Sequence, residues 1–143
     1  MSIQFTIQNP SAPTGSIKLL EQEFSFQLPD DYALFLSKYN GGLPRNCNFA
    51  IPTIGQSSVA FFGLGTLEDY KNISFVQKQY STRISDEFLC IGDDGGGNLI
   101  LLDRKGSIWF WNHELEGEKQ TIFLAHSFTD FLRSLSYEEN EAW

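Results

Sequence analysis

Basic residues and cysteine are both scarce in this 143-residue sequence. Ten Lys and Arg stand against 18 Asp and Glu, so the formal net charge is −8. Proteins that coat phosphate backbones need Lys and Arg, and this balance therefore argues against direct binding of nucleic acid. The two cysteines, Cys47 and Cys90, are far apart, which excludes a zinc knuckle or a redox pair of neighbouring cysteines. We expect two thiols that form no disulfide, as is usual in a reducing cytoplasm.

Long apolar runs are missing as well. No run approaches the roughly 18 residues that a membrane-spanning helix requires, so no membrane partner is predicted. Residues 1–5 contain neither a basic segment nor a long apolar stretch, and we do not expect them to act as a signal peptide. The sequence therefore favours a cytoplasmic protein.

Motifs for catalysis and cofactor binding are also absent. There is no Gly-x-Ser-x-Gly elbow, no Gly-Lys-Ser/Thr after a glycine-rich loop and no His-x-x-x-His pair. Cys90 stands in an apolar segment and is expected to be inert. His113 and Glu114 are adjacent, so on a strand their side chains would face opposite ways. The sequence predicts no cofactor and no metal site.

Aromatic side chains, in contrast, are abundant, with 13 Phe, 5 Tyr and 3 Trp. Flat rings fit half-buried sheet faces and supply a large apolar core. The length suits one domain, and neither a linker nor a repeat divides it. We expect a single domain over residues 1–143, with a strand-like extension over 1–12 and a loosely packed acidic tail over 136–143.

Spacing and capping residues predict four helices. The predicted helices span residues 13–24, 29–39, 66–79 and 127–135. In the second, Pro29 and two acids occupy the first turn, where the helix dipole favours negative charge. Thr66 and Ser127 each precede an acid by three residues, a capping-box pattern that places the starts of the last two helices. We expect Tyr70 to face inward from the third helix.

Short strands account for most of the remaining chain. They are predicted at residues 3–7, within 47–65, and at 88–91, 99–102, 108–111 and 121–124. The glycine-rich segment 93–98 fits a hairpin turn, because Asp and Gly tolerate positive φ, and it lacks the features of a phosphate loop. No helix fits between residues 88 and 124, so the sheet is predicted to be antiparallel and the fold class to be α+β.

Four segments in order carry a family resemblance. They are Leu28-Pro29-Asp30-Asp31-Tyr32 with Asn40-Gly41-Gly42, then 91–98 with 101–103, then 106–114, and finally 125–132. This series resembles the SUKH superfamily, the Smi/Knr-type domains, over about residues 15 to 135. The resemblance implies a twisted antiparallel sheet with N-terminal, middle and C-terminal helices packed on it. The strand-like start is a departure, since many members begin directly with the first helix.

The resemblance also implies a role. Bacterial SUKH domains are mostly immunity proteins that bind and neutralise toxins, often nucleases, while eukaryotic members resemble regulatory scaffolds. Our leading hypothesis is an immunity protein that binds a cognate toxin domain, expected to be a basic nuclease. An acidic inhibitor would associate quickly with such a partner by electrostatic steering.

The candidate contact residues for such a partner are mainly acids predicted in loops. They are Asp93, Asp94, Glu114, Glu116 and Glu118, with Trp111 as an aromatic anchor. The alternative for the acids is an ordinary solvated surface. Trp109 and Trp111 share one face of their strand, and that face is either core or an exposed docking surface.

Two other functions remain open. A non-catalytic regulatory scaffold shares the fold and the charge, and a pull-down that recovers a kinase or wall-synthesis protein would favour it. A small hydrolase or metal enzyme would use Asp93, Asp94 and His113, and metal-binding calorimetry without heat would count against it. The sequence predicts no oligomeric state.

Overall fold

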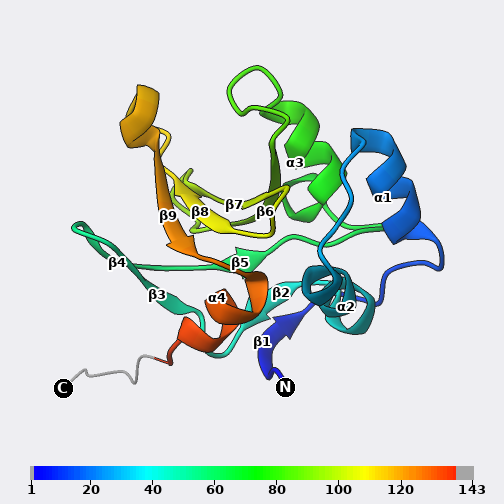
Figure 1. The fold of residues 1–143 in the computed structure, drawn as a ribbon. Helices are drawn as coiled ribbons and strands as arrows, with labels where there is room; N and C mark the ends of the chain where they lie inside the picture. Colours follow the sequence, from blue (N-terminus) through cyan, green and yellow to red (C-terminus); the bar gives the residue numbers. More distant parts are fainter. Residues whose placement is uncertain (1, 138–143) are drawn as a thin grey trace.

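The computed structural model describes residues 2–137, which form a seven-stranded sheet, a separate hairpin and four helices (Figure 1). The helices are α1 (Ser16–Phe24), α2 (Asp30–Tyr39), α3 (Ile73–Gln79) and α4 (Phe128–Ser134). The large sheet contains β1 (Phe5–Gln8), β2 (Gly42–Pro44), β5 (Ala60–Phe61), β6 (Phe88–Asp93), β7 (Leu99–Asp103), β8 (Ile108–Trp111) and β9 (Thr121–Ala125), in that order. The hairpin pairs β3 (Asn48–Ile51) with β4 (Gly55–Ser58). All strand pairs are antiparallel, and the predicted α+β fold class is confirmed.

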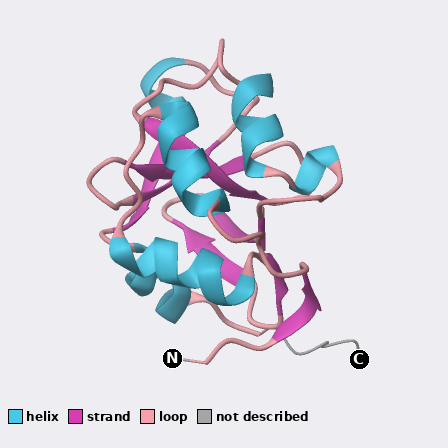
Figure 2. Cartoon of the chain, turned by 90° about the vertical axis from the view of Figure 1, so that its right-hand side faces the viewer, coloured by secondary structure: helices cyan, strands magenta, loops and turns pink. Residues whose placement is uncertain are grey.

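Helices cover the sheet from two sides. On one side the Phe61 ring lies 5.1 Å from Phe35 of α2 and 5.6 Å from Phe128 of α4. On the other side the Trp111 ring lies 5.6 Å from Tyr80, which follows α3. Figure 1 shows α1 and α3 on one side and α2 and α4 on the other, and Figure 2 shows the same two groups from the side. The strands between them are consequently buried on both faces, as the residues of β7 illustrate.

A buried amide ties the N-terminal segment to this core. Asn40 ends α2 in the left-handed conformation, with φ of 56° and no exposed surface. Its Nδ2 donates to the carbonyls of Pro10 and Leu64 at 2.8 and 2.9 Å, and its Oδ1 accepts from the Leu64 N–H at 2.8 Å. Asn9 adds a bond from its Nδ2 to the Asn40 carbonyl at 3.0 Å. The strand-like extension is therefore fixed to the end of α2.

The side-chain amide of Gln77 binds the backbone of β6 where no neighbouring strand does. β5 pairs with β6 only at Gly92 and Asp93, so the first half of β6 lacks a neighbour on that side. Gln77 of α3 accepts from the Cys90 N–H at 2.7 Å and donates to the Phe88 carbonyl at 2.9 Å. Buried backbone groups need such partners, and this contact fixes α3 against the sheet.

The third helix begins later than the sequence predicts. Residues 69–71 form a 3-10 turn, η1 (Asp69–Lys71), and α3 starts only at Ile73 with Asn72 as its N-cap. The helix cannot run through this point because Gly63 pairs with the backbone here, donating to the Lys71 carbonyl and accepting from the Ile73 N–H. The expected inward position of Tyr70 is wrong, since 61% of its surface is exposed. The predicted Ser127 cap is confirmed by a 3.0 Å bond from the Asp130 N–H.

The end of the described chain is held more firmly than expected. Ser136 and Asn48 exchange backbone hydrogen bonds of 2.9 and 3.0 Å, and the guanidinium of Arg45 lies 4.9 Å from the centre of the Tyr137 ring. The rest of the predicted acidic tail lies outside the described residues. Within residues 2–137, none of the helices has the length and apolar character needed to cross a membrane.

Candidate partner-binding face

Two loops meet at one end of the large sheet. β6 and β8 end there while β7 and β9 begin there, because the strands are antiparallel. The first loop is the glycine turn between β6 and β7, and the second contains the 3-10 turn η2 (Gly117–Gln120). Figure 1 shows η2, in orange, projecting beyond the end of β9. All five predicted acidic contacts belong to this end.

Asp94 builds the glycine turn. Its Oδ1 accepts from the N–H groups of Gly96 and Asn98 at 2.8 and 3.1 Å. Its Oδ2 accepts from Asn98 Nδ2 at 2.9 Å and from the Ser57 hydroxyl at 3.4 Å. Both carboxylate oxygens are therefore engaged within the chain, where they hold the turn closed.

Asp93, at the end of β6, has a different environment. Its side chain is half-buried, and burial, followed by the neighbouring charge of Asp94, raises the pKa of the Asp93 carboxyl. No Lys, Arg or His among residues 2–137 forms an ion pair with this carboxyl. Asp93 is the candidate acid that would gain most from an incoming cation.

A polar contact fastens the two loops together. The Oδ1 of Asn98 accepts from the His113 N–H at 3.1 Å and lies 2.7 Å from His113 Nδ1. The imidazole also covers Gly97, where an added Cβ would lie 3.0 Å from the ring in a backbone with φ of 96°. Glycine is thus required at this position both by the close approach and by the positive φ.

The second loop supplies exposed carboxylates. Glu114, Glu116 and Glu118 are all exposed. His113 Nε2 lies 3.9 Å from Glu114 Oε1, so the opposite orientation expected on a strand does not apply to these two residues. The reason is that the chain turns after β8, with the Leu115 N–H donating to the Asn112 carbonyl, and no longer alternates as a strand. We call Asp93, Asp94, Glu114, Glu116 and Glu118 the acidic loop face.

Trp111 does not belong to this exposed face. Only 2% of its surface is exposed, so the alternative that places it in the core holds and the exposed anchor is wrong. Tyr80 packs on its ring, and the Arg83 guanidinium lies 4.7 Å from the ring centre. Arg83 also donates to the His113 carbonyl at 3.3 Å, which links the buried tryptophan to the second loop.

The structure also bears on the catalytic alternative. No three His, Cys, Asp or Glu side chains gather as metal ligands within the part of the chain that the structure describes. Asp94 and His113, two of the three residues of that hypothesis, are engaged with Asn98. Cys90 is fully buried, and burial raises the pKa of its thiol to about 12, as expected for an inert cysteine.

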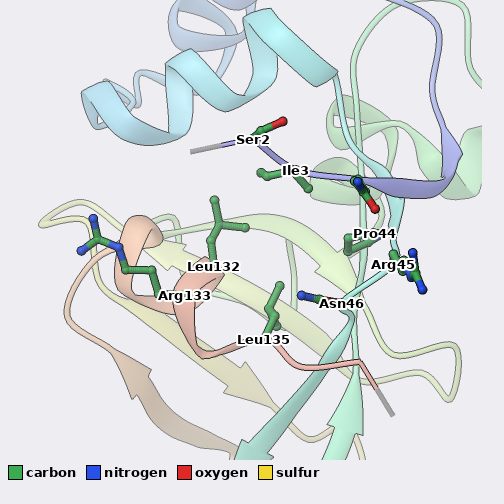
Figure 3. Close-up of a pocket in the computed structure, with 9 residues that line it drawn as sticks. Ser2, Ile3, Pro44, Arg45, Asn46, Leu132, Arg133 and Leu135 are labelled. Atoms are coloured by element: carbon green, nitrogen blue, oxygen red, sulfur yellow. The ribbon is translucent and has the colours of Figure 1, made fainter. Parts of the chain in front are cut away.

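A cavity of about 440 Å³ lies between the N-terminal segment and α4 (Figure 3). Ile3, Leu132 and Leu135 surround it, whereas Arg45 and Arg133 extend away from it in Figure 3. Its lining contains no carboxylate, imidazole or thiol among residues 2–137. We assign it no chemical role.

A second hollow borders the acidic loop face, and the sequence does not predict it. This groove of about 220 Å³ is lined by Ile7, Leu43, Ala60, Tyr70 and Asp93, among others. Its residues come from five separate segments of the chain, and only Asp93 stands out in the sequence. Exposed apolar residues such as Ile7 and Tyr70 could indicate a groove, but the sequence predicts Tyr70 to be buried.

Comparison with known proteins identifies a family and a relative. The family model described as the SMI1 / KNR4 family (SUKH-1) matches residues 12–134. A SPbeta prophage-derived uncharacterized protein, YokK of Bacillus subtilis (strain 168), is 32% identical over 164 aligned positions. That alignment covers 97% of this chain and 84% of the relative. The family match includes the whole acidic loop face and leaves out residues 1–11.

Proposed function

The chain belongs to the SMI1/KNR4 family (SUKH-1), and from this premise we propose that it is an immunity protein. It binds a cognate toxin, a basic nuclease, and blocks the toxin by protein–protein contact without catalysis of its own. We place it in the cytoplasm, where such a toxin would act. The sequence resemblance supports this role, because bacterial SUKH domains are mostly immunity proteins.

The observation that carries the proposal is the acidic loop face. Five carboxylates lie at the end of β6 and on the two loops that Asn98 and His113 hold together at this end of the sheet. A nuclease concentrates Lys and Arg around the groove that holds phosphate. Clustered carboxylates would accelerate association with such a groove and would compete there with the nucleic acid.

Co-expression with the toxin encoded beside this chain tests the role directly. We expect the chain to restore growth of cells that make the toxin, and the purified proteins to form a stable complex. Toxicity that persists despite soluble expression of this chain would falsify the proposal. Recovery of a kinase or wall-synthesis protein, with no protection, would favour the scaffold alternative instead.

A matched pair of variants tests the acidic loop face. The triple variant Glu114→Gln, Glu116→Gln, Glu118→Gln removes three exposed charges from the second loop. The control Asp86→Asn, Glu87→Gln, Asp130→Asn removes three exposed charges near the opposite end of the sheet. We expect the loop variant to associate with the toxin about tenfold more slowly at low salt, and less so at high salt.

The control variant separates a local effect from one of net charge. If both triple variants slow association equally, overall charge and not this face guides the toxin, and the assignment of the face is wrong. Thermal unfolding should change little for either variant, since exposed charges contribute little to stability.

A further inference from the structure

The groove beside the acidic loop face has apolar walls that are open to solvent. Ile7 of β1 exposes 57% of its surface and Tyr70 exposes 61%, and both line the same hollow of about 220 Å³. Leu43 of β2 and Ala60 of β5 also line it. Large apolar side chains left exposed around one hollow mark a surface that gains from being covered.

The groove lining also contains a carboxyl. Asp93 lines the groove and is the cross-strand partner of Ala60, so the two residues are neighbours on the sheet. Lys71 also lines the groove, but its Nζ lies 3.7 Å from Glu68 Oε1 and 5.5 Å from the centre of the Tyr70 ring. The groove therefore combines an aromatic wall with a half-buried carboxyl that has no ion-pair partner among residues 2–137.

This combination matches the chemistry of one side chain. Arginine has an apolar stem that can lie along Ile7 and a planar guanidinium that stacks on an aromatic ring such as Tyr70. The same guanidinium donates two parallel hydrogen bonds to a carboxylate, here that of Asp93. A purely apolar side chain would leave the carboxyl without an ion-pair partner, and an acidic one would be repelled by Asp93 and Asp94.

The groove also continues the acidic loop face. Asp93 belongs to both, and Asp94 lies next to it on the turn. Protein interfaces commonly have an apolar centre surrounded by polar groups. The groove would supply that centre in place of Trp111, which is buried.

We propose that the groove lined by Ile7, Tyr70 and Asp93 receives an arginine of the bound toxin, flanked by apolar residues. The guanidinium pairs with Asp93 and stacks on Tyr70, and the flanking residues cover Ile7. This inference rests on the proposed function, because the occupant is part of the toxin.

Binding measurements with the toxin domain provide the first test. We expect Tyr70→Ala and Asp93→Asn each to raise the dissociation constant about tenfold or more. Leu19→Ala, which removes a side chain that is 65% exposed on α1, and Asp86→Asn serve as controls and should leave it unchanged. Melting curves confirm that all four variants fold.

The outcomes separate the groove from the function. If the toxin binds the two groove variants as tightly as the original chain, while the triple Glu variant associates slowly, the groove proposal is wrong and the immunity role stands. If the chain neither binds nor protects, the proposed function itself fails.

A peptide titration tests the groove without any toxin. The probe is acetyl-Val-Arg-Val-amide, and its control carries citrulline, which has the same shape without the charge. We expect the arginine peptide to shift the amide resonances of Ala60 and Asp93, and these shifts to disappear with citrulline or in Asp93→Asn. Equal shifts with both peptides would overturn the role of the charge, and no shifts at all would overturn the groove as an arginine site.

Discussion

The β6–β7 and β7–β8 turns share one design, although they lie at opposite ends of the sheet. In each, one Asp accepts from the N–H groups two and four residues later; Asp103 is the last residue of β7, and Asp94 directly follows β6. The distances are 2.8 and 3.1 Å for Asp94, and 2.9 and 2.9 Å for Asp103. Each Asp N–H also donates to the carbonyl four residues later. Each second carboxylate oxygen accepts from a side chain, Asn98 in one turn and Trp109 in the other.

Their surroundings differ. The chain covers the β7–β8 turn itself, because Arg104 donates to the carbonyls of Ser25 and Asp86 at 2.6 and 3.0 Å. Gly106 in the same turn is buried, and an added Cβ would lie 3.6 Å from Pro29. In the β6–β7 turn, residues 95–97 are exposed glycines, and residues 93–98 include no Lys or Arg.

Two kinds of aspartate that look alike in the sequence have different roles in the two turns. Asp94 and Asp103 are required to close their turns, whichever end of the sheet they occupy. Asp93 has no counterpart in this design, since Leu102, at the corresponding position before Asp103, is apolar and fully buried. An acid beyond those that the turn needs is the better candidate for binding a partner.

Removing the covered aspartate should have the largest effect on stability. Asp103→Ala takes acceptors away from two backbone N–H groups and from Trp109 Nε1, which lies 2.9 Å away and is half-buried. We expect the free energy of unfolding to fall by about 3 kcal/mol, measured by chemical denaturation. Asp103→Asn keeps one acceptor oxygen and should lose less. A loss below about 1 kcal/mol would show that the turn does not depend on this carboxylate.

The same change in the open turn should cost less. Asp94→Ala leaves the N–H groups of Gly96 and Asn98 without their acceptor, but water reaches this turn and replaces part of what is lost. We expect a loss of about 1.5 kcal/mol in the same assay. If Asp94→Ala and Asp103→Ala cost the same, the covering of the turn has no energetic role and the contrast fails.

Local sequence signals predict much of this fold. Pro29 with its acids, the Asn40-Gly41 end of α2 and the Ser127 cap each act on neighbouring residues, and the structure confirms those helix ends to within a residue. The glycine-rich hairpin turn is also confirmed. Such features depend on backbone geometry that a few adjacent residues determine.

Features that depend on distant pairing are not predicted. The late start of α3 depends on Gly63, and the three-residue strand β2 shows no alternation of its own. The alternation of strand residues shows on which face of the sheet Trp111 lies. It does not show whether other elements cover that face, so the burial of Trp111 is not predicted. The groove cannot be predicted from the sequence for the same reason, because Ile7 and Tyr70 line one hollow only after the chain folds.

Arg104, which covers the β7–β8 turn, should contribute less to stability than either aspartate. Arg104→Ala removes the donor to two exposed carbonyls and an exposed ion pair with Glu87 at 3.4 Å. We expect a loss of about 1 kcal/mol, because water can satisfy both carbonyls and the ion pair contributes little. Lys105→Ala, at the next exposed position, is the matched control and should be neutral. An equal loss for both variants would show that Arg104 does not specifically hold this turn.

The smallest effect, and the one most specific to the open turn, concerns the pH dependence of Asp93. Burial, then Asp94, raises the pKa of the folded Asp93 carboxyl above its ordinary value of 3.8. The folded state therefore holds this proton more tightly than the unfolded state, and stability is lost as pH rises from about 3.8 through the raised pKa. Asp93→Asn cannot ionise, so the melting temperature of the variant, relative to the original chain, should be higher at pH 7 than at pH 3. Asp86→Asn, at an exposed acid, should show no such change with pH. If the difference in melting temperature between Asp93→Asn and the original chain is the same at pH 3 and pH 7, folding does not disfavour the charged form of Asp93. An arginine partner would then gain nothing from stabilising that charge.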